Sequence, residues 1–245
     1  MESKRFLVGG ILIFLIGILA GISFIYVYSV NKAPEQLEEL ENYENSVQST
    51  FVAIDEQGAG VTAKLVTEIR EGTGLVLVNI NNVLADINTQ YSARTAAAIA
   101  SNYTKISLAN LDVIYNLKTE ATIVGGQSAG TIMAVSTIAA LENKTLKQGI
   151  IATGSVNPEG EVVNAGGLIA KAQAAHDDNF TLILVPEGLG SNPTTFKRKK
   201  ICTKTGEKSY CSVQYIGEQI SIGKEIGIEV QEVKTVAEAW KYFEL

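Results

Sequence analysis

The chain has 245 residues, of which 46% are hydrophobic and 19% are charged, with 22 Gly and only 4 Pro. This composition is typical of one globular domain with a short appendage and excludes a fibrous or disordered protein. The net charge of −6 and the pI near 5.0 exclude an extended basic surface for nucleic acid, because the one Lys/Arg run, residues 197–200, is local.

The first predicted element is an uncharged segment from Phe6 to Val30, rich in Ile, Leu, Gly, Phe and Val. As a helix its 25 residues extend roughly 37 Å, enough to cross a bilayer core of ~30 Å. A cleaved signal peptide is the alternative, but its apolar region usually has about 7 to 15 residues. Lys4 and Arg5 precede the segment, whereas glutamates dominate residues 35–44. The positive-inside bias therefore predicts a single-pass anchor, residues 1–30, with a cytoplasmic N-terminus and an extracytoplasmic domain.

Residues 31–50 form the second predicted part, an acidic spacer. Apolar side chains recur at helical spacing behind Pro34, at Leu37, Leu40, Tyr43 and Val47. This pattern predicts a short amphipathic helix. A solvated stalk is favoured over an edge that joins neighbouring copies.

From Phe51 onward, β and α segments alternate, which predicts an α+β domain with a mixed sheet over residues 51–245. Strands are predicted at residues 61–69, 74–80, 111–117, 149–156, 161–163, 181–185 and 226–233. Helices are predicted at residues 86–101, 128–141, 167–176 and 236–243. The basic segment 188–223 is rich in Thr, Ser and Gly, which predicts an inserted loop or hairpin.

Both cysteines of the chain, Cys202 and Cys211, lie in this insertion. On an external domain we expect a disulfide that closes this short loop, with two reduced thiols as the alternative. A metal site is not expected, since there is no further Cys and His176 is the only histidine.

The sequence argues against two common catalytic arrangements. A Ser-His-Asp site would need His176, which ends a predicted helix and is better explained there by the helix dipole. A phosphate loop needs Gly-x-x-x-x-Gly-Lys-Ser/Thr, and the nearest approach, residues 125–131, lacks the lysine. We therefore predict neither ATP hydrolysis nor a cofactor.

Ser128 stands in Gly-Gly-Gln-Ser-Ala-Gly-Thr, directly before a strongly apolar predicted helix. The small neighbours admit a substrate carbonyl, and free N–H groups of the first turn, such as that of Ala129, could stabilise an oxyanion. The commoner role of a serine here is a helix N-cap, which stays open as the alternative.

Lys171 lies on a second predicted helix. Its neighbours at three and four residues are small or apolar, and none is an acid. Desolvation there would lower the lysine pKa and provide a neutral amine as general base. The alternative is a lysine that extends its charged end into water.

Together these segments resemble the proteolytic domain of Lon proteases. The matching runs are Gly-Gln-Ser-Ala-Gly-Thr-Ile-Met-Ala, Ile-Ala-Thr-Gly-Ser, Gly-Gly-Leu-Ile-Ala-Lys and Ile-Leu-Val-Pro-Glu, within about residues 51–245 outside the insertion. The resemblance implies that Ser128 is the nucleophile, that Lys171, 43 residues later, is the base, and that Thr153 orients the lysine amine. It also implies a ring-like homo-oligomer.

Three features depart from the family pattern. Gly125 stands where Lon sequences usually carry an acid, and Ile114 and Asn116 replace a histidine pair of the bacterial branch. The expected form is a stand-alone one, with a membrane span in place of the AAA+ module. These departures leave the nucleophile and the base intact.

The sequence thus predicts a membrane-anchored, ATP-independent serine endopeptidase that hydrolyses unfolded or flexible polypeptides through an acyl-enzyme on Ser128, with Lys171 as base. The expected location is the cell membrane, with the peptidase domain outside the cytoplasm. Two other functions stay open: a non-catalytic binding module of the same fold at the membrane, and a processing peptidase that cuts at defined sites.

Overall fold

The computed structural model describes residues 46–79, 84–118, 123–124, 126–190, 194–205, 208–219 and 221–245. The predicted membrane segment, residues 6–30, and most of the predicted spacer lie outside these residues. Within the described ranges, no helix is both long and apolar enough to span a membrane. The chain divides into residues 1–44 and residues 45–245, and the second unit holds everything described below.

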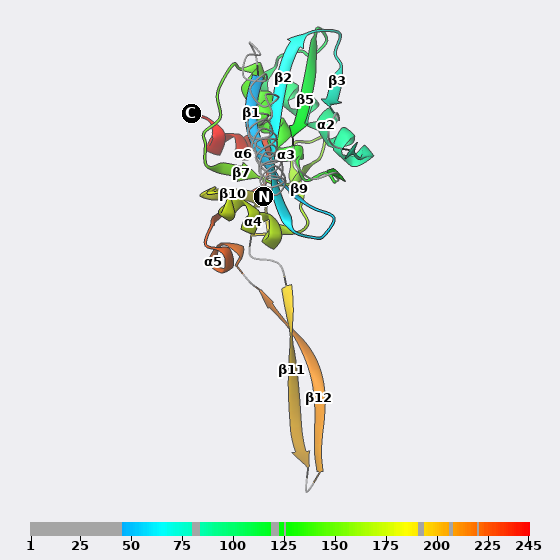
Figure 1. The fold of residues 1–245 in the computed structure, drawn as a ribbon, viewed down its shortest axis with the longest axis vertical. Coiled ribbons are helices and arrows are strands. Elements are labelled where there is room, and N and C mark those ends of the chain that lie inside the picture. The colour runs from blue at the N-terminus through cyan, green and yellow to red at the C-terminus, as the bar shows by residue number, and fades with distance from the viewer. Residues whose placement is uncertain are drawn as a thin grey trace, which may run out of the picture. The chain divides into compact units, whose positions relative to one another are not determined.

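The larger sheet has four strands in the order β1-β2-β5-β3 (Figure 1). β2 pairs antiparallel with β1 and β5, whereas β3 pairs parallel with β5, so the sheet is mixed. The strands are β1 (Ser46–Ile54), β2 (Gly60–Glu71), β3 (Val76–Asn79) and β5 (Leu111–Lys118). Phe51, Leu65 and Tyr115, one from each of the three longest strands of this sheet, lie fully in the core.

A second sheet is parallel, with the order β13-β10-β7. Its strands are β7 (Ile150–Ala152), β10 (Leu182–Pro186) and β13 (Glu229–Val233). β7 and β10 are buried along their whole length, as their continuous apolar sequences predict for parallel strands. Two strand pairs complete the body: β8 (Ser155–Val156) with β9 (Val162–Asn164), and β4 (Leu84–Ala85) with β6 (Ile123–Val124).

Five helices are described: α2 (Ile87–Thr104), α3 (Gly130–Leu141), α4 (Leu168–Asp177), α5 (Ile222–Ile226) and α6 (Val236–Phe243). α3 is the central one, because it is buried from Gly130 through Ala140 and contacts β1, β2, α2 and α6. A helix that is apolar on all sides is expected in a protein interior. Its three buried hydroxyls are satisfied: Thr131 Oγ1 donates to Gly154 O at 2.9 Å, Ser136 bonds Thr67 at 2.8 Å, and Thr137 bonds Tyr115 at 2.6 Å.

The predicted α+β class with a mixed sheet is confirmed, but three predicted segments differ from the structure. Residues 46–50 were assigned to the spacer helix and instead begin β1. Val47 fits the spacing of a helical stripe, but it also lies on the same face of the strand as buried Phe51. The pairing with β2 determines the structure here. The predicted strand 149–156 is interrupted at residues 153–154. Residues 222–226 form a short helix, where the end of the insertion and the start of a strand were predicted.

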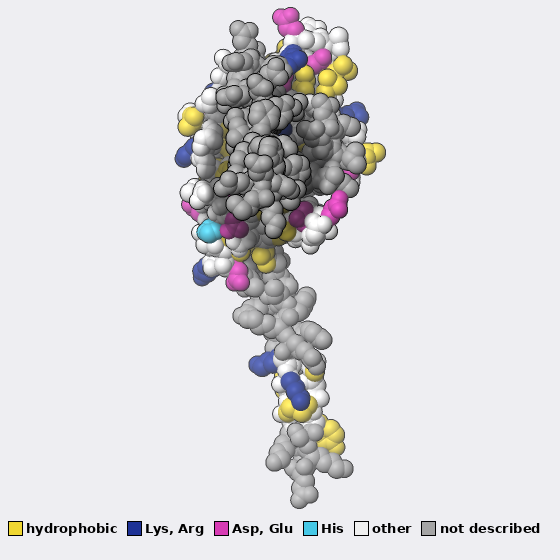
Figure 2. Space-filling view, viewed as in Figure 1, with side chains coloured by type: hydrophobic (Ala, Val, Ile, Leu, Met, Phe, Trp, Pro, Cys, Tyr) yellow, Lys and Arg dark blue, Asp and Glu magenta, His cyan; other side chains and the backbone are white. Residues whose placement is uncertain are grey.

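The insertion forms an antiparallel hairpin, β11 (Thr194–Thr205) with β12 (Lys208–Gln219) (Figure 1). Cys202 lies opposite Cys211, and the two are joined by a disulfide. Lys199 and Lys200 are exposed on the hairpin, where Figure 2 shows basic side chains in dark blue. In the described part of the chain, β11 and β12 form a sheet of two strands only. Two-stranded sheets are marginally stable, so the disulfide is a main restraint on this hairpin.

We expect the double substitution Cys202→Ser with Cys211→Ser to loosen the hairpin and leave the rest of the domain intact. Loss of the closed loop removes roughly 2–3 kcal/mol of restraint. Trypsin should then cut within residues 197–208 at least about tenfold faster, while the main thermal transition shifts by less than about 2 °C. Ser212→Ala, next to Cys211 on β12, is the matched control. Equal cleavage of parent and double variant would contradict this role.

Candidate active site

The segment 126–129 connects β6 to α3 and carries Ser128. Ala129 occupies the N-cap position of α3, and no side chain caps that helix. The alternative that Ser128 serves as a helix cap is therefore wrong. Its hydroxyl is directed instead to Lys171, whose Nζ lies 2.7 Å from Ser128 Oγ.

Lys171 comes from α4, and only 3% of it is exposed. α4 turns Leu168, Ala172 and Ala175 toward an apolar cluster that includes Ile151 and Ile183. The alternative of a lysine extended into water is therefore wrong as well. Two oxygens meet the amine: Ser128 Oγ and, at 3.3 Å, Thr153 Oγ1.

Burial lowers the pKa of Lys171 to about 8. Its surroundings disfavour the charged form, and no carboxylate among the described residues forms an ion pair with it. A substantial fraction of the amine is therefore neutral near physiological pH. A neutral amine 2.7 Å from a hydroxyl can accept its proton, which is the geometry that a general base requires.

Thr153 lies in the gap between β7 and β8 and is buried. Its N–H donates to Leu184 O at 3.0 Å, and the N–H of the next residue, Gly154, donates to Ser128 O at 2.7 Å. Gly154 has φ 155°, and a Cβ there would lie 2.5 Å from Val162 Cγ1. The interruption of the predicted strand is thus the turn that brings Thr153 to the lysine and Gly154 to the serine segment.

Two backbone N–H groups beside the serine are available for a ligand. Those of Ser128 and Ala129 donate to no other group in the part of the chain that the structure describes, whereas Gly130 N–H donates to Gln127 O and Thr131 N–H to Gly154 O, each at 3.0 Å. An oxyanion that forms next to Ser128 could accept from the first two. The donor role predicted for Ala129 fits this arrangement.

The other residues considered from the sequence lie as follows. His176 is in the last turn of α4, with Nδ1 3.5 Å from Asp177 Oδ1, and has no hydrogen bond to the serine or lysine. Asn116 is buried and joins a polar network, donating to Glu68 and accepting from Asn79. Gly125 lies outside the described residues. Across the described ranges, no group of three His, Cys, Asp or Glu gathers in a way that could hold a metal.

Three polar residues that the sequence analysis did not single out also contact the serine segment: Asp86, Thr89 and Ser92, all at the start of α2. Their spacing of three residues places them on one helix face. That spacing was the one feature of the sequence that could have pointed to their role. An Asp followed by a Thr three residues later, however, indicates first of all an ordinary helix N-terminus.

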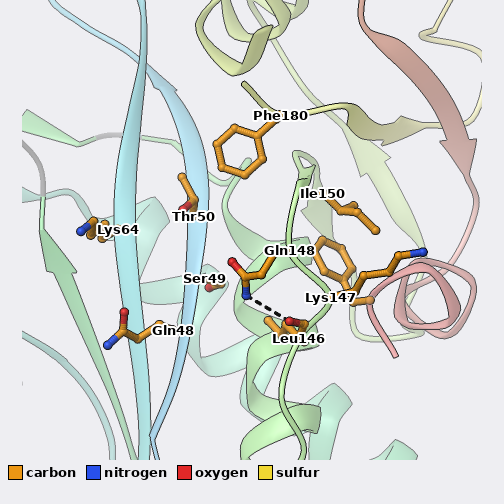
Figure 3. Close-up of a pocket in the computed structure, with 10 residues that line it drawn as sticks. Gln48, Ser49, Thr50, Lys64, Leu146, Lys147, Gln148, Ile150 and Phe180 are labelled. Atoms are coloured by element: carbon orange, nitrogen blue, oxygen red, sulfur yellow. Dashed lines mark hydrogen bonds between the residues drawn. The ribbon is translucent and has the colours of Figure 1, made fainter. Parts of the chain in front are cut away.

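A cavity of about 300 Å³ lies elsewhere, between β1 and the loop that precedes β7 (Figure 3). Gln48, Lys64, Gln148 and Phe180 are among its lining residues, and Gln148 Nε2 donates to Leu146 O at 3.0 Å within it. Neither Ser128 nor Lys171 lines this cavity. The serine and lysine are therefore not part of this hollow.

An α+β domain in which a half-buried serine hydroxyl meets a desolvated lysine amine has the architecture of a serine–lysine hydrolase domain. A family model described as the Lon protease (S16) C-terminal proteolytic domain matches residues 40–198. That match covers more than half of the chain, and the chain belongs to this family.

Similar proteins include the archaeal Lon protease of Thermoplasma volcanium, 28% identical over 132 residues, which are 52% of this chain and 20% of that protein. The archaeal Lon protease of Archaeoglobus fulgidus is 28% identical over 140 residues, 56% of this chain and 22% of that protein. The Lon protease of Endomicrobium trichonymphae is 27% identical over 128 residues, 50% and 16% of the two chains. The aligned part thus spans about a fifth of these relatives.

The lowered pKa of Lys171 predicts a pH-dependent stability. Between about pH 8 and 10.5 the unfolded chain binds more protons than the folded one, so the free energy of unfolding rises with pH across this window. Below pH 8 the folded chain carries the full cost of burying the charged amine, which is roughly 3 kcal/mol. We expect Lys171→Met to be more stable than the parent at pH 7, with a difference that shrinks toward pH 10.5.

Urea denaturation of both proteins at pH 7 and near pH 10 measures this difference. Lys64→Met, at an exposed lysine of β2, controls for the loss of one positive charge. A parent more stable than Lys171→Met at pH 7 would show that burial of the amine is not unfavourable.

Proposed function

We propose that this chain is a serine endopeptidase that cleaves unfolded or flexible polypeptides without ATP. The observation that carries the proposal is the 2.7 Å approach of Lys171 Nζ to Ser128 Oγ, in surroundings that lower the lysine pKa to about 8. Membership of the Lon proteolytic-domain family supports the same reaction class.

In the first step, the neutral amine of Lys171 takes the hydroxyl proton as Ser128 Oγ attacks the peptide carbonyl carbon. The carbonyl oxygen becomes an oxyanion and accepts hydrogen bonds from the N–H groups of Ser128 and Ala129. The Lys171 ammonium then returns the proton to the leaving nitrogen, and the C–N bond breaks. An ester between Ser128 and the acyl part of the substrate remains.

In the second step, Lys171 takes a proton from a water molecule that attacks the ester. The oxyanion forms in the same place, the C–O bond to Ser128 breaks, and the proton returns to Ser128 Oγ. Thr153 accepts one N–H of the lysine, which turns the amine lone pair toward Ser128. This orientation is the role that we assign to Thr153.

ATP independence is part of this proposal, and residues 1–245 contain no Gly-x-x-x-x-Gly-Lys-Ser/Thr loop. A peptidase that does not unfold its substrates acts on chains that are already extended. Polypeptides with flexible segments are therefore the proposed substrates. Cleavage at one or two defined sites, or no cleavage at all, would identify the processing peptidase or the binding module instead.

We further propose that residues 6–30 anchor the domain in the cell membrane, with the peptidase domain outside the cytoplasm. The span is uncharged and long enough for the bilayer core, and basic residues precede it. The disulfide between Cys202 and Cys211 supports the same side of the membrane, because disulfides persist in oxidising compartments. A ring-like assembly of copies, as the family resemblance implies, is part of this proposal.

We expect the full chain in detergent to cleave a fluorogenic unfolded protein without ATP, at a rate that rises with pH through about 8 and then levels off. The rate rises because the base works only when it is deprotonated. Ser128→Ala and Lys171→Met should each lower kcat by roughly 10³-fold or more. The assay measures kcat against pH, with and without ATP and a chelator.

Lys64→Met, away from the dyad, serves as the charge-matched control for Lys171→Met. The proposed dyad would be rejected if Ser128→Ala and Lys171→Met cut as fast as the parent. A single product pattern from every substrate tested would favour the processing peptidase.

A separate expectation concerns the anchor. The full chain should remain with membranes after an alkaline carbonate wash, whereas a chain that lacks residues 1–30 should be released. Protease added to spheroplasts that express the full chain should digest the domain. Protection of the domain until the membrane is dissolved would reverse the proposed topology.

A further inference from the structure

One face of α2 holds the backbone that leads to Ser128. Asp86 Oδ2 accepts the Gly126 N–H at 3.2 Å, and Ser92 Oγ donates to Gln127 O at 3.2 Å. Thr89 Oγ1 donates to Asp86 Oδ1 at 2.9 Å and lies 3.4 Å from Gly126 O. Thr89 and Ser92 are buried, with exposed fractions of 1% and 2%. Three side chains at the start of one helix thus lie against three consecutive peptide groups.

Asp86 has a double task. Its Oδ1 caps α2 by accepting the Thr89 N–H at 2.8 Å, while its Oδ2 accepts from Gly126 N–H and from Asn88 Nδ2 at 3.1 Å. Burial raises the pKa of Asp86, but the hydrogen bonds from Thr89, Asn88 and Gly126 outweigh it and lower the pKa below its ordinary value. The side chain is therefore a carboxylate with both oxygens in use.

The peptide planes connect these contacts to the reaction. Because a peptide group is planar and trans, fixing the Gln127 carbonyl also fixes the direction of the Ser128 N–H, which belongs to the same plane. That carbonyl accepts from Ser92 Oγ and from the Gly130 N–H. In the same way the Ser128 carbonyl, which accepts from Gly154 N–H at 2.7 Å, fixes the direction of the Ala129 N–H.

We propose that Asp86, Thr89 and Ser92 are positioning residues that aim the oxyanion donors. Ser92 acts on the plane of the Ser128 N–H, Asp86 holds Gly126, and Thr89 holds the Asp86 carboxylate. This inference rests on the proposed peptidase function. None of the three touches substrate. They act through the backbone, whose N–H groups must be aimed before the oxyanion forms, because reorganisation during the reaction would cost transition-state stabilisation.

Ser92→Ala tests the proposal most directly, since it removes one hydroxyl from a buried site without adding volume. In the full chain we expect kcat on an extended fluorogenic peptide to fall about 10- to 100-fold, less than the roughly 10²–10³-fold known for loss of an oxyanion donor. KM should change less than about twofold, because the donors act on the transition state. The pH of half-maximal kcat should stay where the parent has it, because the contacts of Lys171 are unchanged.

Asp86→Asn separates the cap from the contact with Gly126. Asparagine caps a helix as well as aspartate does, but it has one acceptor oxygen, so the amide cannot serve both Thr89 N–H and Gly126 N–H. We expect kcat to fall about tenfold with little loss of thermal stability. Asp112→Asn is the matched control: this aspartate accepts the N–H groups of Thr73 and Leu75 in the turn between β2 and β3.

A peptide aldehyde, which forms a tetrahedral adduct with the active serine, gives a second readout. Its affinity should fall with kcat in Ser92→Ala and Asp86→Asn, while binding of an uncleavable peptide stays unchanged. An active parent whose two variants match it in kcat and in aldehyde affinity would overturn the inference and leave the peptidase function standing. An inactive parent would overturn the peptidase function, and this inference with it.

Discussion

The burial of the Lys171 amine is the constraint on which the rest of the site depends. It places a group that prefers water inside an apolar cluster, and the resulting pKa of about 8 makes the amine usable as a base. The close packing of α4 makes the burial possible. A Cβ at Gly60 would lie 2.0 Å from Ala170 O, so glycine at the start of β2 is what lets the helix approach the sheet. Burial of the amine lowers stability at neutral pH, and it also keeps part of the amine in the neutral form that the proposed base requires.

The position of the serine is fixed by elements that are distant in the sequence. α3 is buried on all sides, so its first residues cannot shift without disturbing the core. The turn at Thr153 and Gly154 holds the serine segment from one side, and the face of α2 holds it from another. The hydroxyl, the amine and the free N–H groups therefore belong to one connected set of backbone contacts.

The sequence predicted the chemical groups of the site better than the strands and turns that hold them. Ser128, Lys171 and Thr153 could be placed together by family resemblance, and the small apolar neighbours of Lys171 correctly indicated a lowered pKa. Val47 was misassigned, because one valine fits a helical stripe and an alternating strand equally well. The break at residues 153–154 was missed because it depends on Gly154 meeting Val162 and the serine segment, contacts that no local pattern reports.

The departure from the family pattern at Gly125 counts less against catalysis once the contacts of α2 are considered. An acid three residues before the serine is usual in Lon sequences, and its loss alone would argue for a binding module. A carboxylate nevertheless contacts the serine segment, because Asp86 Oδ2 accepts the Gly126 N–H. A feature that looks missing along the sequence can thus have a counterpart in space, supplied by a helix that begins some forty residues earlier. The loss of the acid at position 125 is therefore weak evidence against catalysis.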